Sequence, residues 1–158
     1  NLCGEFEANM KKLAWLMWAG VLVSCGGSDS RILGAWKLTT ERGGMTATET
    51  CEYLPNHMEN CRNEISGRGL EATTVLTQEW HLEKGQIIEK NIDGKILSIK
   101  LNGEELYPSD ARYQQIAQIV LAENEVKGYT YNRKVDFQGD SFVLHDADGS
   151  TRTYTKVK

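Results

Sequence analysis

Glycine-containing turn pairs divide the second half of this chain into short segments in which apolar and polar residues alternate. Asp93-Gly94 and Asn102-Gly103 favour the positive backbone φ angles that tight hairpin turns require. Residues 74–83 and 95–101, on either side of the first pair, place apolar side chains at alternate positions, which is typical of strands with one buried face. This pattern restricts the chain to antiparallel β-structure joined mainly by hairpins.

The same signals predict about eight strands and one short helix. Strands are expected over residues 32–40, 74–83, 86–92, 95–101, 125–137, 141–145 and 150–157, with a further short one near 47–52. The rest of residues 41–72 is polar and rich in glycine, and we expect a long loop there. Ser109 is a candidate cap for a helix over 111–123, although a strand remains the alternative for that segment. The predicted fold class is all-β: an antiparallel up-and-down barrel, or a barrel-like sandwich.

Size and charge limit the function classes. The 158 residues suit one domain with a real hydrophobic core, and the formal net charge is -4. Phosphate binding needs clustered Lys and Arg side chains, so this acidic balance argues against nucleic acid as the main partner.

The segment "MKKLAWLMWAGVLVSC", which begins at Met10, has the layout of a secretory signal. Two lysines precede an apolar run over residues 13–23, and small residues follow. A helix that spans a bilayer needs about 20 apolar residues, so this run of 11 is too short. We therefore interpret residues 10–24 as a signal peptide and residues 1–9 as an upstream extension.

Leu22-Val23-Ser24-Cys25 resembles the lipobox of bacterial lipoproteins. The resemblance implies that the Cys25 thiol carries lipid and that the chain is cut just before it. Several acyl chains would hold the protein at a membrane where one would not. We thus expect a cell-envelope protein, on the periplasmic face of the outer membrane or on the cell surface. Residues 25–31 would be the lipidated tether and residues 32–158 the folded domain.

The remaining cysteines form an even pair. If Cys3 lies before the start of the mature chain and Cys25 carries lipid, Cys51 and Cys61 are left in an oxidising compartment. A disulfide between them is the favoured interpretation. The alternative is a metal site that uses His57 between the two thiols, but this spacing matches no standard zinc pattern. We expect no metal and no cofactor.

Gly34-Ala35-Trp36, on the first predicted strand of the domain, resembles the Gly-x-Trp signature of lipocalins and lipocalin-like (calycin-like) proteins. The resemblance implies an eight-stranded barrel whose closed end is plugged by the Trp, with a late-strand Arg or Lys across its ring. Arg152 is the candidate for that cation, since a cation over an indole ring is favourable. A plain core Trp near a strand start is the alternative. The chain departs from lipocalins because its predicted helix precedes the final strands.

No pattern in the sequence indicates catalysis: the chain has no nucleophile elbow, phosphate-binding glycine loop or His-Glu-x-x-His helix. We expect a non-enzymatic protein that binds or carries a small hydrophobic ligand in its barrel. The candidate ligand-binding residues are Trp80, Tyr129, Tyr131 and Phe142, and core packing is their alternative role. The alternative function is a solid-core module of the envelope that binds a protein or glycan through the 41–72 loop.

Overall fold

The computed structural model describes residues 29–121 and 127–158. Asp29–Arg31 form a single 3-10 turn, η1, and the β-structure lies in residues 32–158. No helix in the described ranges is long and apolar enough to span a bilayer. The predicted signal peptide, upstream extension and lipidated Cys25 fall outside the described residues.

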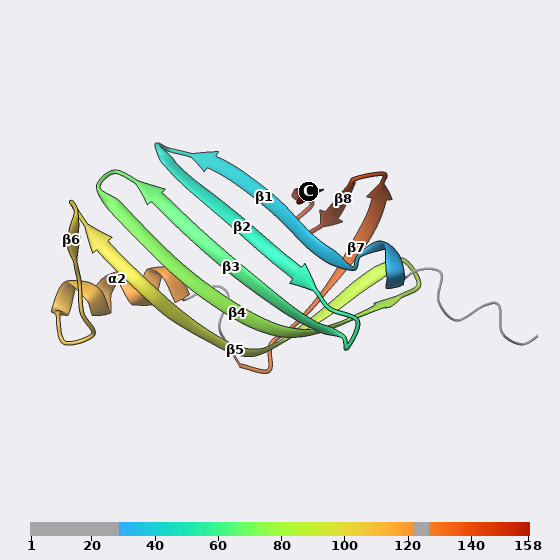
Figure 1. Cartoon of the computed structure of the whole chain (residues 1–158), viewed down its shortest axis with the longest axis horizontal. Helices are drawn as coiled ribbons and strands as arrows, with labels where there is room; N and C mark the ends of the chain where they lie inside the picture. The colour runs from blue at the N-terminus through green and yellow to red at the C-terminus, as the bar shows by residue number, and fades with distance from the viewer. Residues whose placement is uncertain (1–28, 122–126) are drawn as a thin grey trace, which may run out of the picture. The chain divides into compact units, whose positions relative to one another are not determined.

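Eight strands close into an antiparallel up-and-down barrel, which confirms the predicted fold class (Figure 1). Each strand pairs with the next one along the ring, and the last strand, β9, pairs with the first, β1. A two-residue strand, β6 (Glu104–Glu105), lies outside the ring and pairs only with the end of β5. The ring strands are β1 (Gly34–Arg42), β2 (Met45–Tyr53), β3 (Met58–Gly67), β4 (Leu70–Glu83), β5 (Gln86–Leu101), β7 (Thr130–Gln138), β8 (Ser141–His145) and β9 (Thr151–Lys156).

Two-residue turns join β1 to β2, β3 to β4 and β4 to β5. Gly43-Gly44, Arg68-Gly69 and Lys84-Gly85 have φ angles of 60° and 77°, 50° and 79°, and 51° and 77°. Positive φ at both central positions matches the right-handed twist of the strands on either side. Glycine is needed at the second position of each turn because it adopts this conformation without a Cβ clash.

The short strand predicted near residues 47–52 is confirmed as part of β2, but the loop predicted over the rest of residues 41–72 is wrong. The segment contains β2 and β3, which pair along their whole length from Met45↔Gly67 to Tyr53↔Glu59. Their inward positions include glutamate and asparagine, so the apolar alternation that marks a strand is interrupted. The alternative function loses the element it depended on, because the 41–72 segment is part of the barrel wall.

Asp93-Gly94 is not a turn, although the sequence predicts one. Both residues lie within β5, and neither has a positive φ. The pairing of β4 with β5 shifts register between Thr73 and Thr74 and between Thr77 and Gln78. Such bulges bend a strand and increase its twist, so β5 curves through this region without breaking.

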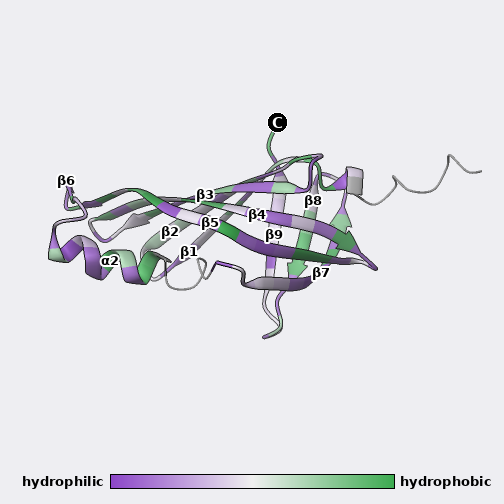
Figure 2. Ribbon diagram, turned by 90° about the horizontal axis from the view of Figure 1, so that it is seen from below, coloured by the Kyte–Doolittle hydropathy of each residue, from purple (hydrophilic) through white to green (hydrophobic). Residues whose placement is uncertain are grey.

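Helix α2 (Ala111–Leu121) confirms the predicted helix, although the cap differs. Asp110 accepts a hydrogen bond from the backbone N–H of Arg112 at 2.8 Å, so Asp110 takes the capping role predicted for Ser109. Only residues 86–90 of β5 pair with β7. The helix lies beside the far part of β5, at the end that carries β6 (Figure 2).

Two separate hydrophobic clusters fill the domain. The first lies where β7–β9 complete the ring and contains Trp36, Tyr53, Trp80, Phe142 and Tyr154. The second lies under α2 and contains Ala72, Ile99, Leu106 and Ala117. The interior between them is where a binding site has room to form.

Candidate functional site

Residues from two adjacent cross-strand rows line a cavity of about 140 Å³ on the inner face of the barrel wall. Strand register places Leu38 opposite Glu49, Glu49 opposite Asn63, and Asn63 opposite Thr74. The next row toward α2 contributes Thr40, Ala47 and Ile65, and Val120 of α2 completes the lining.

The cavity is amphipathic. Leu38, Ala47, Ile65 and Val120 supply apolar surface, while threonines, Asn63 and Glu49 supply polar groups. Among the described lining residues, Glu49 is the one with an ionisable side chain. A cavity with this lining can take a small molecule that has an apolar body and one polar end.

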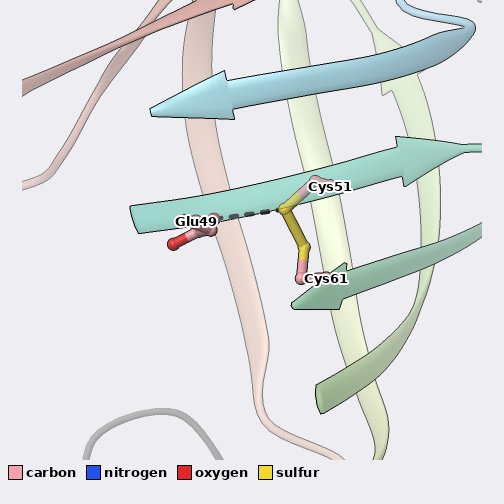
Figure 3. A group of neighbouring side chains, drawn as sticks. All are labelled: Glu49, Cys51 and Cys61. Atoms are coloured by element: carbon pink, nitrogen blue, oxygen red, sulfur yellow. Dashed lines mark hydrogen bonds between the residues drawn. A yellow bond between two sulfur atoms is a disulfide. The ribbon is translucent and has the colours of Figure 1, made fainter. Parts of the chain in front are cut away.

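The predicted disulfide between Cys51 and Cys61 is confirmed. The two cysteines form the cross-strand row next to Glu49 and belong to the first hydrophobic cluster. The two cysteines are directly opposite each other on β2 and β3, with Cα atoms 4.0 Å apart (Figure 3). Both are buried. The bond therefore links two strands that already pair, where the sequence analysis expected it to hold a loop.

Glu49 lies beside this disulfide, and its Oε1 is 3.2 Å from Cys51 Sγ, the approach dashed in Figure 3. A disulfide sulfur has no proton to donate, so this contact does not neutralise the carboxylate. The same carboxylate accepts a hydrogen bond of 2.7 Å from the hydroxyl of Tyr154. Glu49 and the two sulfurs lie within 4.8 Å of one another, but bonded sulfurs are not thiolate ligands for a metal.

The metal alternative also fails at His57. The imidazole of this residue packs against the ring of Trp80, with ring centroids 5.1 Å apart.

A network of charged side chains borders the inner end of the site, with Glu89 and Arg133 buried and Arg152 and Asp146 half-buried. Arg133 donates to Glu89 at 2.8 Å and lies 3.4 Å from Asp146, and the hydroxyl of Tyr53 donates to Glu89 at 2.9 Å. Arg152 makes two hydrogen bonds to Asp146, of 2.7 and 2.9 Å. These groups are held in place by one another, which gives the barrel interior a fixed polar layer.

Glu59 is a fully buried acid within this layer. Burial raises the pKa of Glu59 well above its ordinary range, and repulsion from Glu89 raises it further. Its Oε1 is 3.0 Å from Cys61 Sγ, which again has no proton to give, and its Oε2 has no hydrogen-bond partner in the described part of the chain. Glu59, Glu49 and Asn63 border a second cavity of about 20 Å³, which is the space of one water molecule.

Burial also raises the pKa of Glu89, and the guanidinium of Arg133 opposes that rise. The phenols of Tyr53 and Tyr154 have pKa values raised well above the ordinary value, first by burial and then by neighbouring carboxylates. Both phenols thus stay protonated near neutral pH and remain hydrogen-bond donors to the glutamates.

The residues predicted to close the barrel require one correction. Trp36 is buried in the first hydrophobic cluster, where its indole N–H donates a hydrogen bond to the carbonyl of Ile32 at 2.6 Å. The cation over its ring is Lys156, 5.3 Å from the ring centroid, and not Arg152, which pairs with Asp146. Lys156 is directly opposite Trp36 in the pairing of β1 with β9, whereas Arg152 lies four residues earlier. Gly34 has φ 108°, a conformation that side chains disfavour.

The four aromatic candidates do not come together around the larger cavity. Trp80 and Phe142 are 1 % and 0 % exposed in the first hydrophobic cluster, where both rings contact Tyr53. Tyr129 is 52 % exposed and packs edge-on against Tyr131. Of the four, Tyr131 borders the small cavity, beside the guanidinium of Arg133.

Sequence reasoning missed Asn63 and Glu59 because they lie in the part of residues 41–72 that was predicted as a loop, and it did not single out Glu49 within the short strand predicted near 47–52. A usable signal was present, because the turn pairs Gly43-Gly44 and Arg68-Gly69 bracket the segment that forms β2 and β3. No family model and no curated protein matches this chain.

Proposed function

We propose that this protein is a lipid-anchored, lipocalin-like protein of the bacterial cell envelope that binds a small amphipathic molecule in its barrel, without catalysis. The observation that carries the proposal is the cavity between the two hydrophobic clusters, lined by Leu38, Ala47, Glu49, Ile65 and Val120. An apolar body would lie against the aliphatic side chains, and a polar end would face Glu49.

The size of the cavity limits the ligand. Drug-sized ligands occupy pockets of about 300–1,000 Å³, whereas an apolar cavity of about 150 Å³ accepts a molecule the size of benzene. At about 140 Å³, this cavity suits a ligand in the second class, or one end of a longer molecule.

The lipocalin-like part of the proposal is supported by the closed eight-stranded ring and by Trp36 at one end with Lys156 over its indole. The anchor part rests on the Leu22-Val23-Ser24-Cys25 motif after a short basic and apolar leader.

The binding proposal can be tested with n-hexanol as a neutral amphipathic probe and chemical-shift changes as the readout. We expect saturable changes at Ala47, Ile65 and Val120. Ala47→Phe, which fills the cavity, should abolish them. Thr46→Phe puts the same ring on the opposite face of β2 and is the matched control, so binding should persist. Unchanged binding in Ala47→Phe, or no saturable binding to the wild type, would contradict the proposal.

The anchor is tested separately by expressing the full chain in bacteria with a palmitate analogue that carries a detectable tag. We expect label in the wild type and none in Cys25→Ala, with the wild type recovered in the membrane fraction. An unlabelled wild type, or label that persists in Cys25→Ala, would remove the lipoprotein assignment.

A further inference from the structure

The acidic and basic side chains around the smaller cavity do not balance. Glu49, Glu59 and Glu89 border it together with Arg133 and Arg152, and the half-buried Asp146 contacts both arginines. Arg133 pairs with Glu89 and Asp146, and Arg152 pairs with Asp146. Two acids are therefore left over. Within residues 29–121 and 127–158, no ion pair reaches Glu49 or Glu59.

These two acids both border the smaller cavity, on either side of the Cys51–Cys61 row. Glu49 borders both the larger and the smaller cavity, and Asn63 is its neighbour in both. Glu59 lies deeper and borders only the smaller one. Its Oε2 is buried and has no partner among the described residues. A buried polar atom without a hydrogen bond is costly, so this atom marks a place where a ligand group or water is accommodated.

The surroundings favour one sign of charge. In the larger cavity the described lining has a single carboxylate and no basic side chain. The two arginines that border the smaller cavity are already bonded to Asp146 and Glu89. In a partly dehydrated interior, an unpaired carboxylate attracts a cation and repels an anion more strongly than it would in water.

We infer that the ligand of this cavity is a small amine whose ammonium group binds the Glu49 carboxylate and points toward Glu59. This inference rests on the proposed binding function and adds the chemical class of the ligand. The short apolar part of the amine lies against Leu38, Ile65 and Val120. An ammonium donates up to three hydrogen bonds, and the Glu49 carboxylate and the side-chain oxygens of Asn63 and Glu59, which border these cavities, are the acceptors we assign to them.

The test compares three probes of equal chain length by calorimetric titration of the wild-type protein at pH 7: n-hexylamine, n-hexanol and hexanoate. We expect the amine to bind most tightly, the alcohol more weakly and hexanoate least. Glu49→Gln should weaken amine binding roughly 10- to 100-fold, the span of one charge-assisted hydrogen bond, while alcohol binding changes little. Glu52→Gln, on the exposed face of the same strand, is the matched control and should bind as the wild type does.

The outcomes separate the inference from the proposed function. If alcohol and amine bind equally, or Glu49→Gln keeps the amine preference, the inference is wrong and the binding function stands. If hexanoate binds most tightly, Arg133 and Arg152 determine the charge of the ligand that is preferred, and the inference is overturned. If none of the three probes binds, both fail. The order of the three probes on wild-type protein decides the matter even if Glu49→Gln does not fold.

Discussion

At the scale of single residues, the buried Glu59 makes folding depend on pH. Its folded-state pKa lies above the ordinary value of 4.5 that applies to the unfolded chain. Below pH 4.5 both states keep the proton. As the pH rises from there to the folded-state pKa, only the unfolded state ionises, so the stability contributed by the protonated carboxyl is lost.

Glu59→Gln should therefore gain stability relative to the wild type as the pH rises above 4.5. One proton limits the slope to about 1.4 kcal/mol per pH unit. Urea unfolding of both proteins between pH 4 and pH 8 measures this difference in stability. A difference that does not change with pH would mean that Glu59 is already ionised in the folded protein.

Trp36 and Lys156 contribute very different amounts at the closed end of the barrel. Trp36→Ala should cost about 3–5 kcal/mol because a fully buried ring is removed, whereas Lys156→Met should cost about 1 kcal/mol or less, since it loses only a cation–π contact. Denaturant unfolding of both variants checks the order. Equal losses would show that the cation, and not the buried ring, holds this end.

At the scale of elements, the β2–β3 hairpin depends on both its pairing and its disulfide. The double variant Cys51→Ala, Cys61→Ala should be less stable than the wild type by about 2–4 kcal/mol. A reducing agent should lower the unfolding midpoint of the wild type and leave that of the double variant unchanged. If the double variant unfolds at the same midpoint as the oxidised wild type, the register of β2 and β3 alone supports the hairpin.

Helix α2 is held to the barrel by the second cluster, and Ile99 is its fully buried member on β5. Ile99→Ala should cost about 2–5 kcal/mol and increase hydrogen exchange in α2. Leu97, two residues earlier, is 49 % exposed, so Leu97→Ala is the matched control and should change stability by about 0.5 kcal/mol or less. Unchanged exchange in α2 after Ile99→Ala would contradict this packing.

The elements that the sequence predicted correctly carry strong local signals. Apolar alternation with a lysine-glycine turn predicted β4 and the start of β5, and helical spacing predicted α2. The sequence missed β3 and predicted β2 only as a short strand near 47–52. Both strands lack such signals because they turn glutamate and asparagine inward, toward a polar interior. Asp93-Gly94 has the composition of a turn, but long-range pairing of β5 with β4 overrides it.

At the scale of the whole molecule, short alternating segments joined by turns were enough to predict a closed antiparallel barrel, although the expected strands omitted β3 and divided β5 into two. The position of the cavity was not predictable in the same way. It depends on register, which aligns Leu38, Glu49, Asn63 and Thr74 across four strands, and on α2, which supplies Val120 from outside the ring. The charge of Arg133 likewise reaches Glu89, 44 residues away in the sequence, only through the pairing of β5 with β7.

The central claim is that the barrel carries a small molecule in this cavity, and native mass spectrometry tests it most directly. Full-length wild type and Ala47→Phe would be expressed in bacteria, extracted from membranes and measured without denaturation. The account predicts a small-molecule adduct on the wild type that is absent from Ala47→Phe and retained by Thr46→Phe. Wild-type protein that is consistently free of adduct, or an identical adduct on Ala47→Phe, would contradict it.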